Sequence, residues 1–187
     1  IDNPRIKQIP VPPMIRCVLV HPRMFLGTRD ARGILNRSVD LADVVWQTAN
    51  LAGFLAGCYT SDLAMIRDAF EDVMIEPQRA RLIPGFAEVK RAAMDRGALG
   101  CSISGAGPSV FAWCEEAQAS AIAAAMAQAF AGEGGECALG GLFLCRHFPG
   151  PPRLSRLSHS LCSCLVTDGG DEHVGQPDGG RGVEGDR

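Results

Sequence analysis

The feature that most constrains the fold is a pair of short apolar runs joined by a glycine-rich segment. Residues 101–104 (CSIS) and 109–113 (SVFAW) are typical of strands, and residues 105–108 (GAGP) lie between them. Glycine and proline at such a junction favour a tight turn, so the sequence predicts a β-hairpin. An amphipathic helix is expected before it, over 86–96, and an alanine-rich helix after it, over 117–131.

Upstream of the hairpin, the sequence predicts one strand and several helices. Residues 15–21 form a β-branched apolar run bounded by prolines, which is typical of a strand. We expect a short helix capped by Thr28, a long one capped by Asp40, and another that begins near Asp62 and ends before Pro77. The long helix has an apolar stripe that should face a core, made of Leu41, Val44, Val45, Thr48, Leu51, Ala52 and Leu55.

These elements predict the fold class. Strand, helices, two strands and a helix follow one another, and a further strand near Glu136 would complete an α+β two-layer sandwich with a mostly antiparallel sheet. After residue 138 the periodicity disappears, and beyond Gly150 the chain is rich in Gly, Arg, Ser and Pro. We expect a disordered tail there. It is either a natural flexible tail or a segment read out of frame, and the sequence leaves both open.

Composition narrows the function classes. With 187 residues, 47% of them hydrophobic, the chain can bury a core as one domain plus appendages. A net charge of −3 without a Lys/Arg run argues against nucleic-acid binding, and no apolar stretch is long enough to span a membrane. Because the chain begins at Ile1, without a recognisable targeting segment, we expect a fragment or a processed product.

The cysteines indicate reduced thiols. All 8 are scattered without a CxxC pair, and the nearest two, Cys162 and Cys164, lack a second pair at zinc-ligand distance. We therefore expect no metal site and a cytoplasmic protein. None of the 4 histidines has a nucleophile or ligand partner at readable spacing, so no catalytic residue is assigned.

Two segments could bind anions. The turn at 104–109 (SGAGPS) can point successive N–H groups one way, although an ordinary glycine-rich turn is the alternative. It matches neither the Walker nor the GxGxxG pattern. Residues 75–86 hold Arg79 and Arg81 between prolines, and a rigid arginine can clamp a carboxylate or phosphate. Taken alone, these arginines and Arg32 are interpreted as solvated surface charges.

Together these motifs resemble a known family. Residues 76–115, EPQRARLIPGFAEVKRAAMDRGALGCSISGAGPSVFAWCE, are similar to the homoserine kinase family of the GHMP small-molecule kinases. In that family an E-P-x-R loop precedes LIPGF, a helix and a glycine-rich SGAGP turn. Residues 28–35 (TRDARGIL) resemble the family's A-R-x-I-L-P stretch, except that Asn36 stands at the proline position. The resemblance covers about residues 6–137.

The resemblance implies both a domain layout and a reaction. Residues 15–137 would be a ferredoxin-like C-terminal GHMP kinase domain, 1–14 the end of an absent N-terminal half with its linker, and 138–187 a low-order tail. The implied reaction is transfer of the γ-phosphoryl group of ATP, with Mg²⁺, to the hydroxyl of L-homoserine. Its product would be O-phospho-L-homoserine, in threonine biosynthesis. A homodimer is one assembly to consider.

The resemblance also implies site residues. Arg32 and Arg79 would face homoserine. The turn that supports the nucleotide phosphates would consist of Ser104, Gly105, Ala106 and Gly107. The family's P-x-x-x-G-L-G-S-S-A loop is absent, so we expect this chain alone to be inactive. The alternatives are another GHMP kinase, acting on mevalonate or a sugar, or an inactive remnant that acts only as a binding module.

Overall fold

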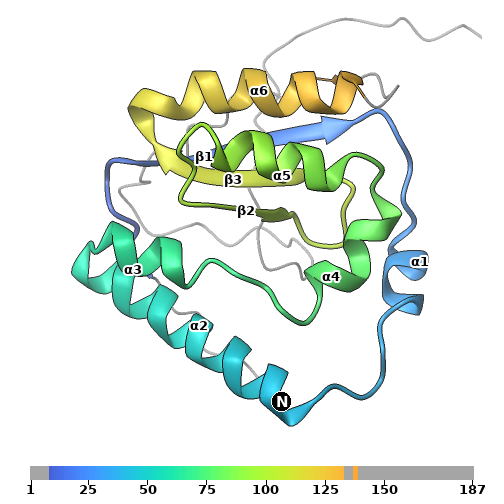
Figure 1. The fold of residues 1–187 in the computed structure, drawn as a ribbon, viewed down its shortest axis with the longest axis horizontal. Coiled ribbons are helices and arrows are strands. Elements are labelled where there is room, and N and C mark those ends of the chain that lie inside the picture. Colours follow the sequence, from blue (N-terminus) through green and yellow to red (C-terminus); the bar gives the residue numbers. More distant parts are fainter. Residues whose placement is uncertain (1–8, 133–136, 139–187) are drawn as a thin grey trace, which may run out of the picture.

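The computed structural model describes residues 9–132 and 137–138, which form an antiparallel sheet flanked by helices (Figure 1). The strands are β1 (Ile15–Pro22), β2 (Gly100–Ile103), β3 (Val110–Glu115) and β4 (Cys137–Ala138). The helices are α1 (Thr28–Gly33), α2 (Leu41–Thr60), α3 (Leu63–Asp68), α4 (Glu76–Arg79), α5 (Phe86–Met94) and α6 (Ala119–Gly132). Short 3-10 helices cover Ala80–Leu82 and Glu116–Gln118.

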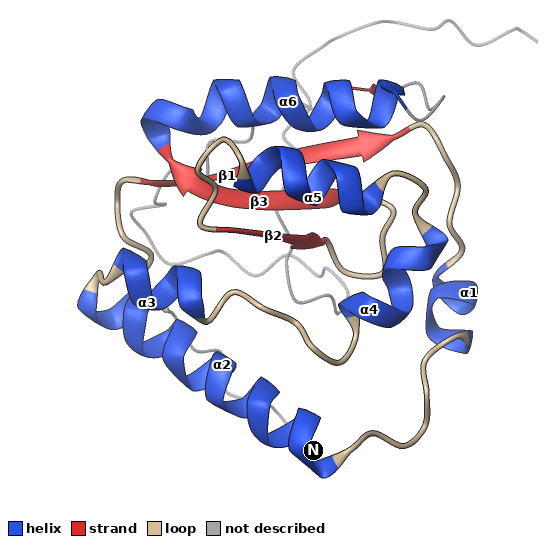
Figure 2. Cartoon of the chain, viewed as in Figure 1, coloured by secondary structure: helices blue, strands red, loops and turns tan. Residues whose placement is uncertain are grey.

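The sheet has the order β2-β3-β1-β4, with every pair antiparallel (Figure 2). β1 and β3 pair from Ile15 opposite Glu115 to Val20 opposite Val110. The predicted hairpin is confirmed as β2 and β3. The predicted late strand is also found, as the two residues of β4 beside β1. The α+β class is therefore confirmed.

The main core lies between the sheet and the pair of helices α5 and α6. Alternate residues of β1 and β3 point to this side, because side chains alternate between the two faces of a strand. The buried residues of this core include Val18, Val20, Val110, Ala112, Val89, Ile122, Met126 and Phe130. Burial of such side chains contributes about 25 cal/mol per Å² of apolar surface removed from water.

A second, smaller core lies on the other face, at the sheet end where β1 begins. It joins Ile15 and Leu99 to Cys58 of α2 and Ile66 of α3. An aromatic group extends it along the sheet, with Phe70 lying 5.6 Å from Phe54, 5.9 Å from Phe111 and 5.7 Å from Trp113 between ring centroids. This core attaches only the C-terminal half of α2 to the sheet.

The orientation of α2 corrects the sequence interpretation. Its buried residues are Gly57 and Cys58, whereas Leu41, Val45 and Leu51 of the predicted core-facing stripe are 76%, 62% and 56% exposed. The apolar stripe faces solvent in the described chain. The periodicity correctly predicted a helix but not the side on which it packs.

Helix ends are partly as predicted. Asp62 caps α3, and its Oδ1 accepts a hydrogen bond from the Met65 amide at 3.0 Å. Gly27, not Thr28, is the N-cap of α1 and supplies no side-chain cap. Pro77 does not terminate the preceding helix, because it occupies the first turn of α4, where a missing N–H costs nothing.

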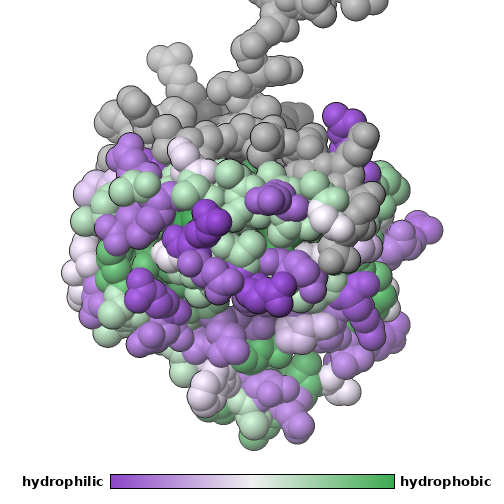
Figure 3. Space-filling view, turned by 45° about the horizontal axis from the view of Figure 1, so that its top comes forward, coloured by the Kyte–Doolittle hydropathy of each residue, from purple (hydrophilic) through white to green (hydrophobic). Residues whose placement is uncertain are grey.

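Some predictions concern residues outside the described ones. These are the disordered tail after 138 and residues 1–8 of the predicted linker. Within the described part, no helix combines the length and apolarity that crossing a membrane requires. The space-filling view shows hydrophilic side chains interspersed with apolar ones over the visible face (Figure 3).

Candidate functional site

The glycine-rich turn, residues 104–109, connects β2 to β3 at the sheet end where β1 finishes. Two backbone hydrogen bonds close it. The Ser104 amide donates to the Ser109 carbonyl at 2.8 Å, and the Gly107 amide donates to the Ser104 carbonyl at 3.0 Å. The turn therefore holds one defined path between the strands.

Two glycines make this path sterically accessible. Gly105 and Gly107 have φ angles of 58° and 86°, in the left-handed region that side chains disfavour. A Cβ atom on Gly107 would lie 3.0 Å from Ile83 Cδ1 and 3.2 Å from Leu26 Cδ2. Gly107 is thus required both by its backbone angle and by its packing.

The amides of Gly105 and Ala106 lie between the two hydrogen-bonded positions. Among the residues that the structure describes, no hydrogen bond engages these two N–H groups. Successive amides of a glycine-rich turn that make no hydrogen bond within the turn can donate to an anion. This part of the turn can accordingly serve as a phosphate or carboxylate contact.

Arg79 joins the turn to helix α1. Its Nη1 donates to the Gly105 carbonyl at 2.7 Å, and its Nε donates to the Ala31 carbonyl at 3.2 Å. An arginine has five N–H donors, so these two bonds leave the remaining donors available. The side chain is half-buried and held at two points, which fixes the direction of its guanidinium group.

Further hydrogen bonds hold the end of α1 against α4. Gln78 Oε1 accepts from the Asn36 amide at 2.7 Å, and Gln78 Nε2 donates to the Met74 carbonyl at 2.6 Å. Arg81 Nη2 approaches the Ile34 carbonyl at 3.5 Å. Residues that follow one another in α4 and the next turn therefore fix α1, which carries Arg32.

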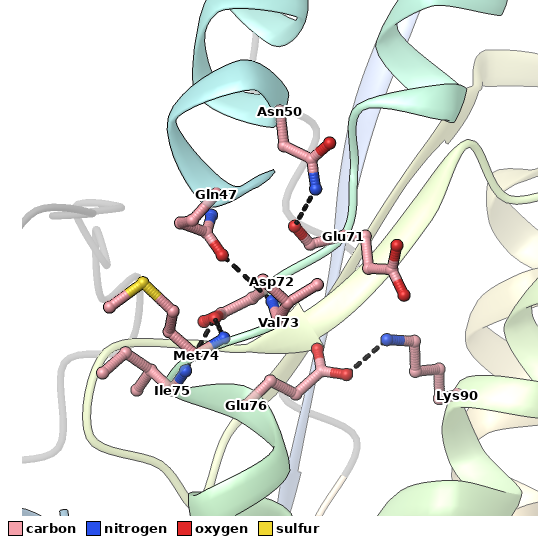
Figure 4. Close-up of polar contacts among 9 residues, drawn as sticks. All are labelled: Gln47, Asn50, Glu71, Asp72, Val73, Met74, Ile75, Glu76 and Lys90. Atoms are coloured by element: carbon pink, nitrogen blue, oxygen red, sulfur yellow. Dashed lines mark hydrogen bonds and ion pairs between the residues drawn. The ribbon is translucent and has the colours of Figure 1, made fainter. Parts of the chain in front are cut away.

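The first residue of α4, Glu76, forms a buried ion pair with Lys90. Glu76 is 9% exposed and accepts a short hydrogen bond at Oε1 from Lys90 Nζ of α5, as Figure 4 shows. Its Oε2 is buried without a hydrogen-bond partner among the described residues.

Burial raises the pKa of the neighbouring Cys101 thiol to about 12; the Lys90 charge lowers that pKa and the Glu76 charge raises it. Cys101 is therefore a neutral thiol at physiological pH, unsuited to nucleophilic attack.

The loop that leads into α4 is held from α2. Asn50 Nδ2 donates to the Glu71 carbonyl at 2.9 Å, and Gln47 Oε1 accepts from the Val73 amide at 3.0 Å (Figure 4). Asp72 Oδ1 accepts from the amides two and three positions further on, at 2.9 and 2.7 Å. This network orders the approach to α4 and to Arg79.

A histidine and a serine lie together at the same end of the sheet. His21 Nδ1 is 2.8 Å from Ser109 Oγ, between neighbouring strands. In the described part of the chain, no group of three or more His, Cys, Asp or Glu residues could hold a metal ion.

Part of the chain is similar to proteins of a known family. Residues 54–132 match the family described as GHMP kinases C terminal. The homoserine kinase of Xanthomonas campestris pv. campestris (strain B100) is 50% identical over 131 residues, which cover 70% of this chain and 41% of the relative. The crystal structure of homoserine kinase from Cytophaga hutchinsonii ATCC 33406 matches with a TM-score of 0.69 at 40% identity, covering 71% of this chain and 42% of that one.

Residues 54–132 are thus similar to the C-terminal domain of GHMP kinases. A further relative, the homoserine kinase of Chlorobium phaeovibrioides (strain DSM 265 / 1930), is 49% identical over 65% of this chain and 38% of its own length. The chain thus spans about two fifths of the relatives that it matches. The resemblance to the C-terminal part of homoserine kinases is confirmed.

Within the described part of the chain, the predicted site residues occupy neighbouring elements. Arg79 contacts the glycine turn directly and α1 through the Ala31 carbonyl, one residue before Arg32. Arg32 is exposed, and among the described residues no hydrogen bond or ion pair engages its guanidinium group. The structure brings the two arginine-bearing helices and the turn together, while the roles of Arg32, Arg79 and the turn remain predictions.

Sequence reasoning missed two contacts at this end of the sheet. Gln78 lies within the arginine segment, but its partner Asn36 is 42 positions away, so no local pattern indicated the contact. His21 and Ser109 are separated by 88 positions. Pairing of the predicted strands in antiparallel register would have placed His21 and Ser109 side by side.

Proposed function

We propose that this GHMP kinase domain is the C-terminal part of an enzyme that phosphorylates the hydroxyl of L-homoserine with ATP. The product is O-phospho-L-homoserine, and the reaction belongs to threonine biosynthesis in the cytoplasm. The observation that carries the proposal is the double contact of Arg79, which joins the glycine turn to the helix of Arg32. The named homoserine kinases among the relatives supply the substrate.

The chain's own residues would act by positioning. Phosphoryl transfer depends mostly on alignment of the reactants and on stabilisation of charge, with little covalent chemistry from the protein. Amides of Gly105 and Ala106 would donate to phosphate oxygens of the nucleotide. Arg32 and the remaining donors of Arg79 would bind the carboxylate of homoserine and so orient its hydroxyl.

The anchoring of Arg79 sharpens this proposal. Because Nε and Nη1 already bind backbone carbonyls, little side-chain entropy is lost when the guanidinium group binds substrate. Removal of Arg79 would also leave the Gly105 carbonyl without this donor, so the nucleotide contact would be disturbed as well. Arg32, which makes no such contact, gives the cleaner test of substrate binding.

A chimaera provides that test. The matching residues of this chain replace the corresponding part of the Xanthomonas campestris relative, and ADP release is followed at varied homoserine and ATP concentrations. Removal of one partner of a buried arginine–carboxylate pair costs about 2–5 kcal/mol. Arg32→Leu should therefore raise the KM for homoserine by tens-fold or more and leave the KM for ATP nearly unchanged, whereas Arg29→Leu on the same helix should change neither.

Several outcomes would contradict the proposal. Turnover with mevalonate or a sugar but not with homoserine would show that homoserine is not the substrate. An unchanged homoserine KM in Arg32→Leu would remove Arg32 from the site. The 187-residue chain without the remaining part of the relatives should show no appreciable turnover, because most of the nucleotide site is expected from that part.

A further inference from the structure

Glu76 is the one buried charge in the described part of the chain. No other polar or charged residue that the structure describes is buried, and Glu76 Oε1 accepts a hydrogen bond from Lys90 Nζ. Its Oε2 has no hydrogen-bond partner among the same residues. Burial of a carboxylate costs free energy that a single partner offsets only in part, and apolar residues of similar volume often stabilise a fold equally well. Stability alone therefore does not account for the Glu76–Lys90 pair.

Helix α4, which begins at Glu76 and ends at Arg79, is too short to maintain its own position. It has 4 residues, whereas isolated helices shorter than about 12 residues are marginal in water. Its position thus depends on side chains that join it to neighbouring elements. Gln78 and Arg79 make such contacts with the end of α1 and with the glycine turn, and Glu76 makes one with α5.

Lys90 holds Glu76 from a rigid helix. Val89 and Ala93 of α5 are fully buried in the main core, and Phe86 at its start is nearly so. Helix α5 therefore cannot shift without disturbing this core. The Lys90 and Glu76 side chains point toward one another from α5 and α4 (Figure 4). The ion pair thus fixes the first residue of α4 to the main core.

The ion pair also lies beside the strand that leads into the glycine turn. Helix α4 contacts β2, and the pKa of the Cys101 thiol in β2 is raised mainly by burial, lowered by the Lys90 charge and raised by the Glu76 charge. Both charges are therefore close to β2, which ends directly before the turn. Arg79 lies one helical turn after Glu76, and its Nη1 reaches the Gly105 carbonyl. One end of α4 is held beside the strand and the other at the turn.

We propose that Glu76, through its ion pair with Lys90, is a positioning residue for Arg79. The pair holds α4 in the orientation in which Arg79 binds the Ala31 and Gly105 carbonyls at once. The bond from Arg79 Nε to the Ala31 carbonyl is 3.2 Å long, at the upper end of the usual range, so a small displacement of α4 breaks it first. This inference rests on the proposed function only where it assigns the remaining donors of Arg79 to the substrate.

Hydrogen exchange of the Arg79 Nε–H group, measured by NMR on the whole chain, tests the positioning without catalysis. Glu76→Gln keeps the shape of the side chain but removes its charge, and it should speed this exchange by about tenfold, as expected when one hydrogen bond opens. Glu116→Gln is the matched control, because Glu116 pairs with Arg16 at the other end of the sheet, and it should leave the exchange unchanged. Circular dichroism checks that both variants remain folded. Unchanged exchange in Glu76→Gln would overturn the proposal.

The double variant Glu76→Gln/Lys90→Met separates positioning from stability. It should recover part of the stability that Lys90→Met loses, because no unpaired charge stays buried. Exchange of the Arg79 Nε–H group should nevertheless remain fast, because the two new side chains make no directional contact between α4 and α5. Exchange that slows again as stability returns would show that the pair acts through stability alone, which contradicts the proposal.

A double-mutant cycle in the chimaera tests the link to the substrate. Glu76→Gln should raise the KM for homoserine several-fold, and in an Arg79→Leu background it should raise that KM no further, because Glu76 acts through Arg79. Ile122→Val, a small change in the main core, should have equal effects in both backgrounds. An equal effect of Glu76→Gln in both backgrounds would refute the positioning. Fast exchange of the Arg79 Nε–H group in Glu76→Gln, combined with a homoserine KM that neither Glu76→Gln nor Arg79→Leu changes, would instead support the positioning and refute substrate binding by Arg79.

Discussion

Gly100→Ala should destabilise the fold through one side chain, Phe70. Gly100 is buried in β2 opposite Trp113, and a Cβ atom there would lie 2.0 Å from Phe70 Cγ and 2.1 Å from Phe70 Cδ1. Ordinary contacts of a Cβ atom begin near 3.4 Å, so the ring must retreat by about 1.4 Å, the difference between 3.4 and 2.0 Å. The added methyl group cannot be accommodated without moving this ring.

The expected cost follows from what the ring contacts. Phe70 lies within 6 Å, centroid to centroid, of Phe54, Phe111 and Trp113. Each such aromatic pair is worth about 0.5–1.5 kcal/mol beyond area burial, and overpacking of a core costs typically about 1–3 kcal/mol. We expect Gly100→Ala to lower the free energy of unfolding by about 2–3 kcal/mol, after a small gain from the stiffer unfolded chain.

Urea unfolding followed by tryptophan fluorescence measures this change, and a double-mutant cycle identifies its cause. Phe70→Ala alone is destabilising because it removes the ring contacts. In that background, however, Gly100→Ala should cost less than about 0.5 kcal/mol, since the clash is gone. An equal cost of Gly100→Ala with and without the Phe70 ring would refute the steric reasoning.

Three further changes test other parts of the structure. Gly107→Ala should cost about 1–3 kcal/mol because of its φ of 86°, whereas Gly132→Ala, which meets nothing within 4 Å, should be nearly neutral in the same unfolding measurement. Burial raises the pKa of the Cys101 thiol to about 12 from 9.0, so unfolded chains lose this proton first. The free energy of unfolding should then fall as pH rises from 9.0 towards about 12, and Cys101→Ala should make that fall shallower; an unchanged slope would contradict the assignment. Lys90→Met should destabilise by about 1–3 kcal/mol, less than a fully buried pair because Lys90 is 30% exposed, and adding Glu76→Gln should restore part of the loss.

Local signals in the sequence predicted the elements around the glycine turn. The hairpin follows from GAGP between two apolar runs. Gly97, predicted to follow the helix, has a φ of 87°, although α5 ends at Met94, two residues before the predicted Arg96. Each of these features depends on residues a few positions apart. The local signals therefore located the turn of the candidate site correctly.

Contacts between distant residues were not predictable in the same way. The bond from Arg79 to the Gly105 carbonyl spans 26 positions, and that from Arg79 to the Ala31 carbonyl spans 48. Their acceptors are backbone carbonyls, which every residue carries, so the residue types do not indicate these contacts. The sequence indicated that an arginine lay on a rigid segment, but its anchoring required the fold.

The outward stripe of α2 shows why an apolar period does not identify its own partner. Where α2 meets α3, two glycines of α2 allow close approach: a Cβ on Gly57 would lie 2.8 Å from Ile66 Cγ1, and one on Gly53 would lie 3.2 Å from Ala69 Cβ. Glycine lets the two helices approach closely, yet it adds little to a hydrophobic period. Large apolar residues such as Leu41 and Val45 therefore dominate the pattern although they are exposed. Gly53 and Gly57, which a hydrophobic period does not register, thus mark the side on which α2 packs against α3.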